Sequence, residues 1–209
     1  MKVLSWKGGS VRQELHIPVA NRRKHSIGSA WRRALEIGLF DLFLGFLLRR
    51  SFTKAGVIQV TPGWPLPKVM NMGGRIEVDN CRFFPGVRIE CWKGAIIKIG
   101  KGTYLNRNTE LVAAGSITIG ADCKIARDVM IMDTDQHPVG ANALETKPVE
   151  IGDRVWLGSR VIILKGVTIG HDSIVGAGAI VTKSVPPHSV VVGPAARVIK
   201  NLQEENTVV

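Results

Sequence analysis

Aliphatic residues return every six positions along much of the chain, a period that fits neither a helix nor a simple alternating strand. Four segments align on this period: IIKIGKGTYL from Ile96, SITIGADCKI from Ser116, PVEIGDRVWL from Pro148 and GVTIGHDSIV from Gly166. A weaker earlier copy, RIEVDNCRF, has Val78 in the equivalent place. The repeated aliphatic positions are 99, 105, 111, 119, 125, 131, 151, 157, 163, 169, 175 and 181.

This period suits a coil of three short flat strands, each with one inward aliphatic residue and a turn. Three such units make 18 residues, which matches the spacings 151→169 and 169→187. The interval 99→119 needs a two-residue insertion, and 119→151 needs a surface loop of about fourteen residues. Because stacked coils bury a continuous aliphatic column, we expect an all-β parallel β-helix over residues 73–200, with a loop at about 133–148.

The net charge of +11 is concentrated in the N-terminal third. Residues 1–72 hold 12 Lys and Arg against 3 Asp and Glu, a net +9, whereas residues 73–209 hold 16 against 14, a net +2. This division argues against a uniformly basic nucleic-acid-binding protein. The three cysteines form neither a disulfide framework nor a metal-ligand spacing, so we expect buried structural thiols in a reducing cytoplasm.

The basic extension, residues 1–72, contains the segment WRRALEIGLFDLFLGFLLRR at 31–50. Its apolar run, 14 residues from Leu35 to Leu48, is too short to cross a bilayer comfortably and predicts a helix. Two placements stay open for this helix: the interface of an anionic membrane, or the flank of the β-helix or a subunit contact. TPGWPLPK at 61–68 is a Pro-rich connector, and 201–209 is a loose tail.

Residues 75–200 resemble the hexapeptide-repeat acyltransferases. The most specific stretch is WLGSRVIILKGVTIGHDSIVGAGAIVTKSVPPHSVVVGPAARVIK, residues 156–200, which is similar to sugar O-acetyltransferases of the maltose and galactoside type. The resemblance implies a left-handed parallel β-helix, although parallel crossovers are otherwise right-handed. It also implies acetyl-CoA as the acyl donor and a homotrimer with sites between neighbouring subunits.

The predicted loop contains DTDQHPVG, and its histidine is the candidate catalytic base. Binding and catalytic groups concentrate on loops held by rigid scaffolds, and Asp133 or Asp135 is close enough in sequence to orient the His137 imidazole. The alternative is a solvated surface histidine. QHPV also falls where the resembling enzymes carry their catalytic histidine, which implies general-base catalysis on a sugar hydroxyl.

Further site residues follow from the resemblance, position by position. Asn106 and Trp156 fall at acceptor-side positions, with plain packing as the alternative for Trp156. Gly158 and Ser159 lie at a turn whose backbone N–H groups are candidate oxyanion donors. The cofactor-side positions that the resemblance implies are Gly158, Ser159, Ala177, Thr182, Lys183 and Arg197. A solvated basic edge is the alternative for Lys183 and Arg197.

Two departures from the family fall on the acceptor side. Ala113 and Ala114 stand where the galactoside-type enzymes have acidic residues, and the histidine loop is one residue longer. We therefore expect acetyl-CoA more firmly than a particular sugar. We expect no metal, since no two of His16, His25, His137, His171 and His188 have a spacing that brings them to one site.

Taken together, these features predict an acetyl-CoA-dependent O-acetyltransferase acting on a saccharide, resembling those of exopolysaccharide and capsule assembly. The N-terminal segment favours a lipid-linked or polysaccharide-precursor acceptor, with the enzyme in the cytoplasm and in peripheral contact with the inner membrane face. The enzymatic alternative is N-acetylation of an amino-sugar nucleotide, although residues 1–75 show no Gly-rich nucleotide-binding signature. The other alternative is a β-helix that serves only as an assembly scaffold.

Overall fold

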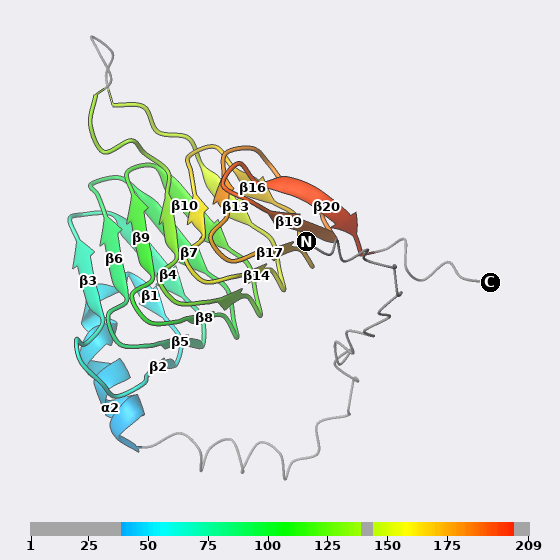
Figure 1. Ribbon diagram of the computed structural model, residues 1–209. Coiled ribbons are helices and arrows are strands. Elements are labelled where there is room, and N and C mark those ends of the chain that lie inside the picture. The colour runs from blue at the N-terminus through cyan, green and yellow to red at the C-terminus, as the bar shows by residue number, and fades with distance from the viewer. Residues whose placement is uncertain (1–38, 139–143, 203–209) are drawn as a thin grey trace, which may run out of the picture. The chain divides into compact units, whose positions relative to one another are not determined.

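The computed structural model describes residues 39–138 and 144–202, and they form a parallel β-helix with one short α-helix at its N-terminal end (Figure 1). Residues 31–38 of the predicted helical segment and most of the predicted tail lie outside the described residues. None of the described helices is both long and apolar enough to cross a membrane.

Three sheets, here called A, B and C, form the faces of the β-helix. Sheet A contains β1 (Lys54–Ala55), β4 (Arg75–Val78), β7 (Ile96–Ile99), β10 (Ser116–Ile119), β13 (Val149–Ile151) and β16 (Thr168–Ile169). Sheet B contains β2 (Ile58–Val60), β5 (Cys81–Phe83), β8 (Tyr104–Leu105), β11 (Lys124–Ile125), β14 (Trp156–Leu157), β17 (Ile174–Val175), β19 (Ser189–Val192) and β20 (Arg197–Asn201). Sheet C contains β3 (Lys68–Asn71), β6 (Arg88–Cys91), β9 (Glu110–Ala113), β12 (Met130–Met132), β15 (Ile162–Ile163) and β18 (Ile180–Val181).

The register stacks equivalent residues of successive coils directly over one another. Ile99 pairs with Ile119, Ile119 with Ile151 and Ile151 with Ile169, all in parallel strands. Among the described strands, only β19 and β20 pair antiparallel. Each coil therefore pairs most of its backbone groups with the coils above and below it.

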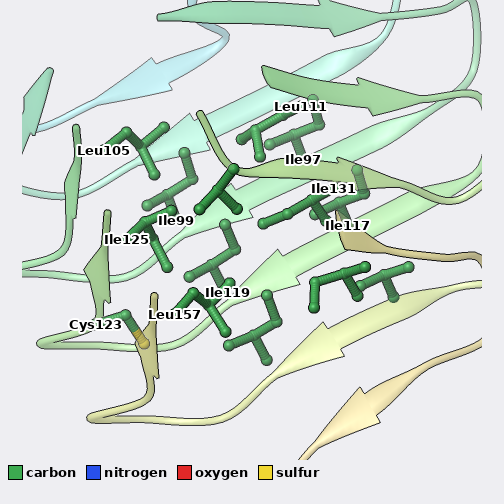
Figure 2. Close-up of a cluster of buried hydrophobic side chains, with 14 of the residues drawn as sticks. Ile97, Ile99, Leu105, Leu111, Ile117, Ile119, Cys123, Ile125, Ile131 and Leu157 are labelled. Atoms are coloured by element: carbon green, nitrogen blue, oxygen red, sulfur yellow. The ribbon is translucent and has the colours of Figure 1, made fainter. Parts of the chain in front are cut away.

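The predicted aliphatic column is confirmed. All twelve repeated positions are at most 3% exposed, and Val78, the weaker copy, is 4% exposed. Figure 2 shows seven of these side chains pointing into the centre: Ile99, Leu105, Leu111, Ile119, Ile125, Ile131 and Leu157. Burying each one removes apolar surface from water, worth about 1.5–3 kcal/mol per side chain.

Two boundaries differ from the sequence-based expectation. The β-helix begins at residue 54 rather than 73, because β1, β2 and β3 already pair with the next coil. The last coil is shorter than 18 residues, since Val185 rather than Pro187 pairs with Ile169. Pro187 is exposed, and residues 61–68 connect two strands of the first coil.

The helix α2 (Leu39–Leu48) packs against β2 and is followed by the 3-10 turn η1 (Arg49–Ser51). Gly45 faces the strand so closely that a Cβ there would lie 1.9 Å from the Ile58 carbonyl oxygen. Leu44 and Leu48 pack on the core, whereas Phe43 and Phe46 are 54% and 64% exposed. The helix thus covers the first coil with one face and leaves an apolar face uncovered.

We expect Ile97→Ala to lower the free energy of unfolding by about 2–5 kcal/mol, because Ile97 is fully buried and leaves a cavity. Ile96→Ala is the matched control, since Ile96 lies on the same strand but points outward and is only partly buried. Denaturant unfolding followed by circular dichroism measures both. Equal losses for the two variants would contradict the inward and outward assignment.

Candidate functional site

Turns of successive coils stack into three longitudinal edges, named here after the sheets they join. The A–B, B–C and C–A edges follow the strands of sheets A, B and C, respectively. On the B–C edge, the residues after β8, β11, β14 and β17 form one column, because Leu105, Ile125, Leu157 and Val175 pair in register. Each predicted site residue can be placed on this frame.

The B–C edge brings together Asn106, Gly158, Ser159 and Ala177. The Gly158 N–H donates to the Val175 carbonyl at 2.8 Å, and the Gly178 N–H donates to the Ser159 carbonyl at 2.8 Å. The Gly158 N–H is therefore already hydrogen-bonded to the next coil and cannot act as an oxyanion donor. In the described part of the chain, the Ser159 and Ala177 N–H groups meet no acceptor, so both are available to a ligand.

Gly158 has a structural reason to be glycine. A Cβ at this position would lie 2.6 Å from the Ala177 backbone nitrogen, which is closer than real side chains approach. The absence of a side chain lets two coils stack tightly beside the free Ser159 and Ala177 amides. Gly158 therefore allows the two coils to pack closely, and it contributes no free N–H group to the predicted site.

The predicted loop leaves the C–A edge, between the end of β12 at Met132 and the start of β13 at Val149. Asp133 anchors its first stem: its buried carboxylate accepts hydrogen bonds of 2.8 Å from the Ala114 and Gly115 N–H groups. The Lys147 N–H donates to the Asp133 carbonyl at 2.9 Å. The base of the loop is therefore fixed to the coil below it.

Lys165, from the coil above, joins the two stems of the loop. Its ammonium forms ion pairs with Asp135 in the first stem and with Glu145 in the second, the latter at 2.5 Å. Glu145 also contacts Lys147 at 2.8 Å, and these two cations, Lys147 foremost, lower the Glu145 pKa to about 2. The Asp135 and Glu145 carboxylates in turn raise the Lys165 pKa. Sequence reasoning missed this residue, which carries no motif.

His137 lies on this loop with its side chain exposed. The preceding residue, Gln136, has a φ of 63° and donates its N–H to the Thr134 hydroxyl at 3.1 Å, forming a tight turn. Within residues 39–138 and 144–202, no group forms a hydrogen bond or ion pair with the imidazole. Asp133 bonds to backbone and Asp135 to Lys165, so the expected aspartate–histidine pairing is not formed in the single chain. A catalytic role for His137 stays a prediction.

The remaining predicted residues lie on different parts of the surface. Trp156 projects from sheet B between Lys124 and Ile174 and is 49% exposed, so it is not plain core packing. Thr182 and Lys183 follow β18 on the C–A edge, and Arg197 begins β20 at the end of sheet B. The predicted site residues therefore lie on the B–C edge, on the C–A edge and on sheet B, and one chain does not bring them together.

The three cysteines are not candidates for nucleophilic catalysis. Cys81, Cys91 and Cys123 are buried free thiols, as expected. Burial raises the pKa of Cys81 to about 12 and raises the pKa of the other two thiols as well. Thiols of this kind hold little thiolate at neutral pH, so a covalent acyl-cysteine intermediate is disfavoured.

The expectation that no two histidines share a site is wrong. His171 and His188 lie on the A–B edge with ring centroids 4.7 Å apart, in an edge-to-face arrangement. Their separation of 17 residues is close to the length of one coil, a signal that was present in the sequence. Asp172 lies beside them, with a carboxylate oxygen 2.8 Å from the Nδ1 atom of His171.

Comparison with known proteins is consistent with this architecture. Residues 148–183 match the family model described as the hexapeptide repeat of succinyl-transferase. Galactoside O-acetyltransferase of Escherichia coli (strain K12) is 40% identical over 118 residues, covering 54% of this chain and 58% of the relative. This chain thus spans a little over half the length of that curated relative.

Two solved structures are similar in fold. A hexapeptide-repeat acetyltransferase from Vibrio cholerae O1 biovar eltor, complexed with acetyl coenzyme A, is 28% identical with a TM-score of 0.57, covering 84% of this chain and 86% of that one. A polysialic acid O-acetyltransferase is 28% identical with a TM-score of 0.53, covering 69% and 75%. In sequence and in fold, this chain resembles the hexapeptide-repeat acetyltransferases.

We expect Lys165→Met to release the loop, because the variant keeps the aliphatic stem but loses both ion pairs. Limited proteolysis within residues 135–148 should become roughly tenfold faster, since local opening governs cleavage. The free energy of unfolding should change little, because exposed ion pairs contribute at most about 1 kcal/mol.

Lys183→Met is the matched control, since Lys183 follows the next strand on the same edge and no ion pair is found for it among the described residues. If Lys165→Met is cleaved no faster than the wild type and the Lys183→Met control, Lys165 does not hold the loop.

Proposed function

We propose that this chain is an acetyl-CoA-dependent O-acetyltransferase that modifies a saccharide hydroxyl, as its similarity to hexapeptide-repeat acetyltransferases suggests. The observation that carries the proposal is the exposed side chain of His137, which has no partner among the described residues, on a loop whose base is anchored to the β-helix by Asp133 and Lys165. A scaffold protein has no need for such a loop. The similarity to a galactoside and a polysialic acid O-acetyltransferase supports a saccharide acceptor.

The donor would lie along the B–C edge. The free N–H group of Ala177 suits an amide carbonyl of a pantetheine arm, and the complex of the Vibrio cholerae relative supports acetyl-CoA as donor. Arg197 would contact the phosphorylated nucleotide end, and Thr182 and Lys183 would reach it from the C–A edge of a neighbouring copy, since cationic side chains favour phosphate. Lys183 and Arg197 are both exposed, so both are accessible to a ligand of this size.

The chemistry requires one base and one oxyanion donor. His137 takes the proton of the acceptor hydroxyl as its oxygen attacks the thioester carbonyl, and the Ser159 N–H stabilises the developing oxyanion. The tetrahedral intermediate then expels the CoA thiolate, with cleavage of the carbon–sulfur bond. The imidazolium returns its proton to that thiolate, so the enzyme ends the cycle unchanged.

The site would be composite. His137 belongs to the C–A edge and the Ser159 and Ala177 amides to the B–C edge, and sheet C separates these edges within one chain. A homotrimer in which the C–A edge of one copy faces the B–C edge of the next would bring the two groups to one substrate. Asn106 and the exposed Trp156 would then contact the acceptor. A neighbouring subunit would also supply an orienting partner for His137, which has none within residues 39–138 and 144–202.

The uncovered face of α2 supports a membrane-associated acceptor, such as a lipid-linked glycan. Phe40, Phe43, Phe46 and Leu47 are 59%, 54%, 64% and 51% exposed, and their spacing places them on one side of the helix. Arg49 and Arg50 follow directly and suit anionic headgroups. The opposite face packs on β2, so the flank placement holds for that face, and the membrane placement is proposed for the exposed face.

We expect His137→Ala to lower acceptor-dependent CoA release from acetyl-CoA at least about a hundredfold, because general-base catalysis contributes roughly 10²–10⁴-fold. Acetyl-CoA affinity should stay near wild type. The acceptor panel contains neutral sugars, nucleotide sugars, amino-sugar nucleotides and lipid-linked glycans. Lys101→Gln is the control, since Lys101 is an exposed residue on the A–B edge and belongs to neither proposed site.

Turnover of His137→Ala at the wild-type rate would exclude His137 as the base. Turnover only with amino-sugar nucleotides, and acetyl transfer to nitrogen, would replace the O-acetyltransferase with an N-acetyltransferase. Failure of the wild type to bind acetyl-CoA would leave the scaffold alternative.

We expect the wild-type protein to co-sediment with vesicles of phosphatidylglycerol and phosphatidylcholine, and the Phe43→Asp/Phe46→Asp variant to remain in the supernatant. The two carboxylates place charge in the apolar face without altering the face that packs on β2. Circular dichroism checks that the variant is folded. Equal sedimentation of variant and wild type would exclude α2 as the membrane contact.

A further inference from the structure

We propose that His171, Asp172 and His188 form a binding site for a divalent transition-metal ion of the zinc class, which joins the last two coils of the β-helix. One ligand atom from each residue can be chosen so that all of them lie within 4.8 Å of one another. The proposal is independent of the transferase chemistry, because these residues lie on the A–B edge and not on the edges assigned to acetyl transfer.

The backbone fixes the relative positions of the ligands. The His188 N–H donates to the His171 carbonyl at 3.0 Å, so the two turns are stacked by the coil ladder. Asp172 and His188 both have left-handed backbone conformations, with φ of 58° and 56°, and occupy equivalent corner positions. The two imidazoles meet edge to face, with an interplanar angle of 89°.

Asp172 supplies a carboxylate that the structure holds in place. Arg154 contacts both of its oxygens, at 2.6 and 2.7 Å. Each carboxylate oxygen has two lone-pair directions; Oδ2 is contacted by both Arg154 and His171, so one direction remains on Oδ1. One oxygen already lies 2.8 Å from the His171 Nδ1 atom, which also orients that ring.

The donor set selects the class of metal. Two imidazole nitrogens and one carboxylate oxygen suit zinc, nickel, copper or cobalt, whereas magnesium and calcium prefer oxygen ligands alone. His171 is half exposed, so an ion has a direct path from solvent, and water can complete the coordination. Three protein ligands with bound water are compatible with a four-coordinate zinc ion.

A bound ion would stabilise the C-terminal end of the β-helix. Asp172 and His171 belong to the turn between β16 and β17, and His188 directly precedes β19. An ion held by all three would fasten the short final coil to the one before it. β20, which begins at Arg197, is carried by β19, so the ion would also stabilise the strand that bears a proposed donor-side cation.

The test uses the full-length, tag-free protein, stripped with chelator and titrated with zinc chloride by isothermal titration calorimetry. We expect one zinc ion per chain in the wild type. His188→Gln and His171→Gln should each weaken the Kd at least about tenfold, because both remove a ligand and loss of even an outer partner costs 10–100-fold. His137→Gln is the matched control and should bind zinc like the wild type.

Thermal unfolding supplies a second readout. Zinc should raise the Tm of the wild type and of His137→Gln, because a ligand that binds only the folded state stabilises it. The same zinc concentration should leave the Tm of His188→Gln unchanged. Wild-type affinity and Tm shift in His188→Gln would overturn the proposal, as would loss of zinc binding in His137→Gln or absence of binding in the wild type.

Discussion

Every feature of this molecule depends on the register in which successive coils stack. One aliphatic side chain from each short strand enters the centre, and the backbone hydrogen bonds of each coil are satisfied by its neighbours. A shift of one residue would turn the buried aliphatics outward, so the register is strongly specified. Because it is fixed, residues one coil apart in the sequence become direct neighbours along an edge.

This constraint explains where the molecule can carry chemistry. Inward side chains pack in the core, and most N–H groups of the turns are hydrogen-bonded to neighbouring coils. What remains are outward side chains, the few unpaired amides such as those of Ser159 and Ala177, and insertions such as the loop bearing His137. The loop still depends on the coils, since Asp133 is held by the coil below and Lys165 reaches it from the coil above. The scaffold thus determines the position of the loop base.

The sequence was sufficient to predict what depends on local spacing. The twelve core positions, the loop and the three buried thiols follow from the six-residue period and from composition. The start at residue 54 was missed because Lys54–Val60 lacks the Ile-Gly step, and the short last coil because the period was extended to Pro187. The interaction partners of individual side chains were harder to predict, because Asp133, Asp135 and Lys165 pair with residues of other coils rather than with their sequence neighbours. The contact between His171 and His188 could have been predicted from the number of residues in one coil, but it was not recognised.

The central claim is that the C–A edge of one copy and the B–C edge of the next act on the same acetyl-CoA. A crystal structure of the protein with acetyl-CoA bound measures this most directly. The account predicts a trimer in which the thioester oxygen accepts a hydrogen bond from the Ser159 N–H of one subunit. It also predicts that His137 of the neighbouring subunit faces the thioester carbon, leaving room for an acceptor hydroxyl about 3 Å from the imidazole. Acetyl-CoA bound away from both edges, or His137 turned away from the thioester in every subunit, would contradict it.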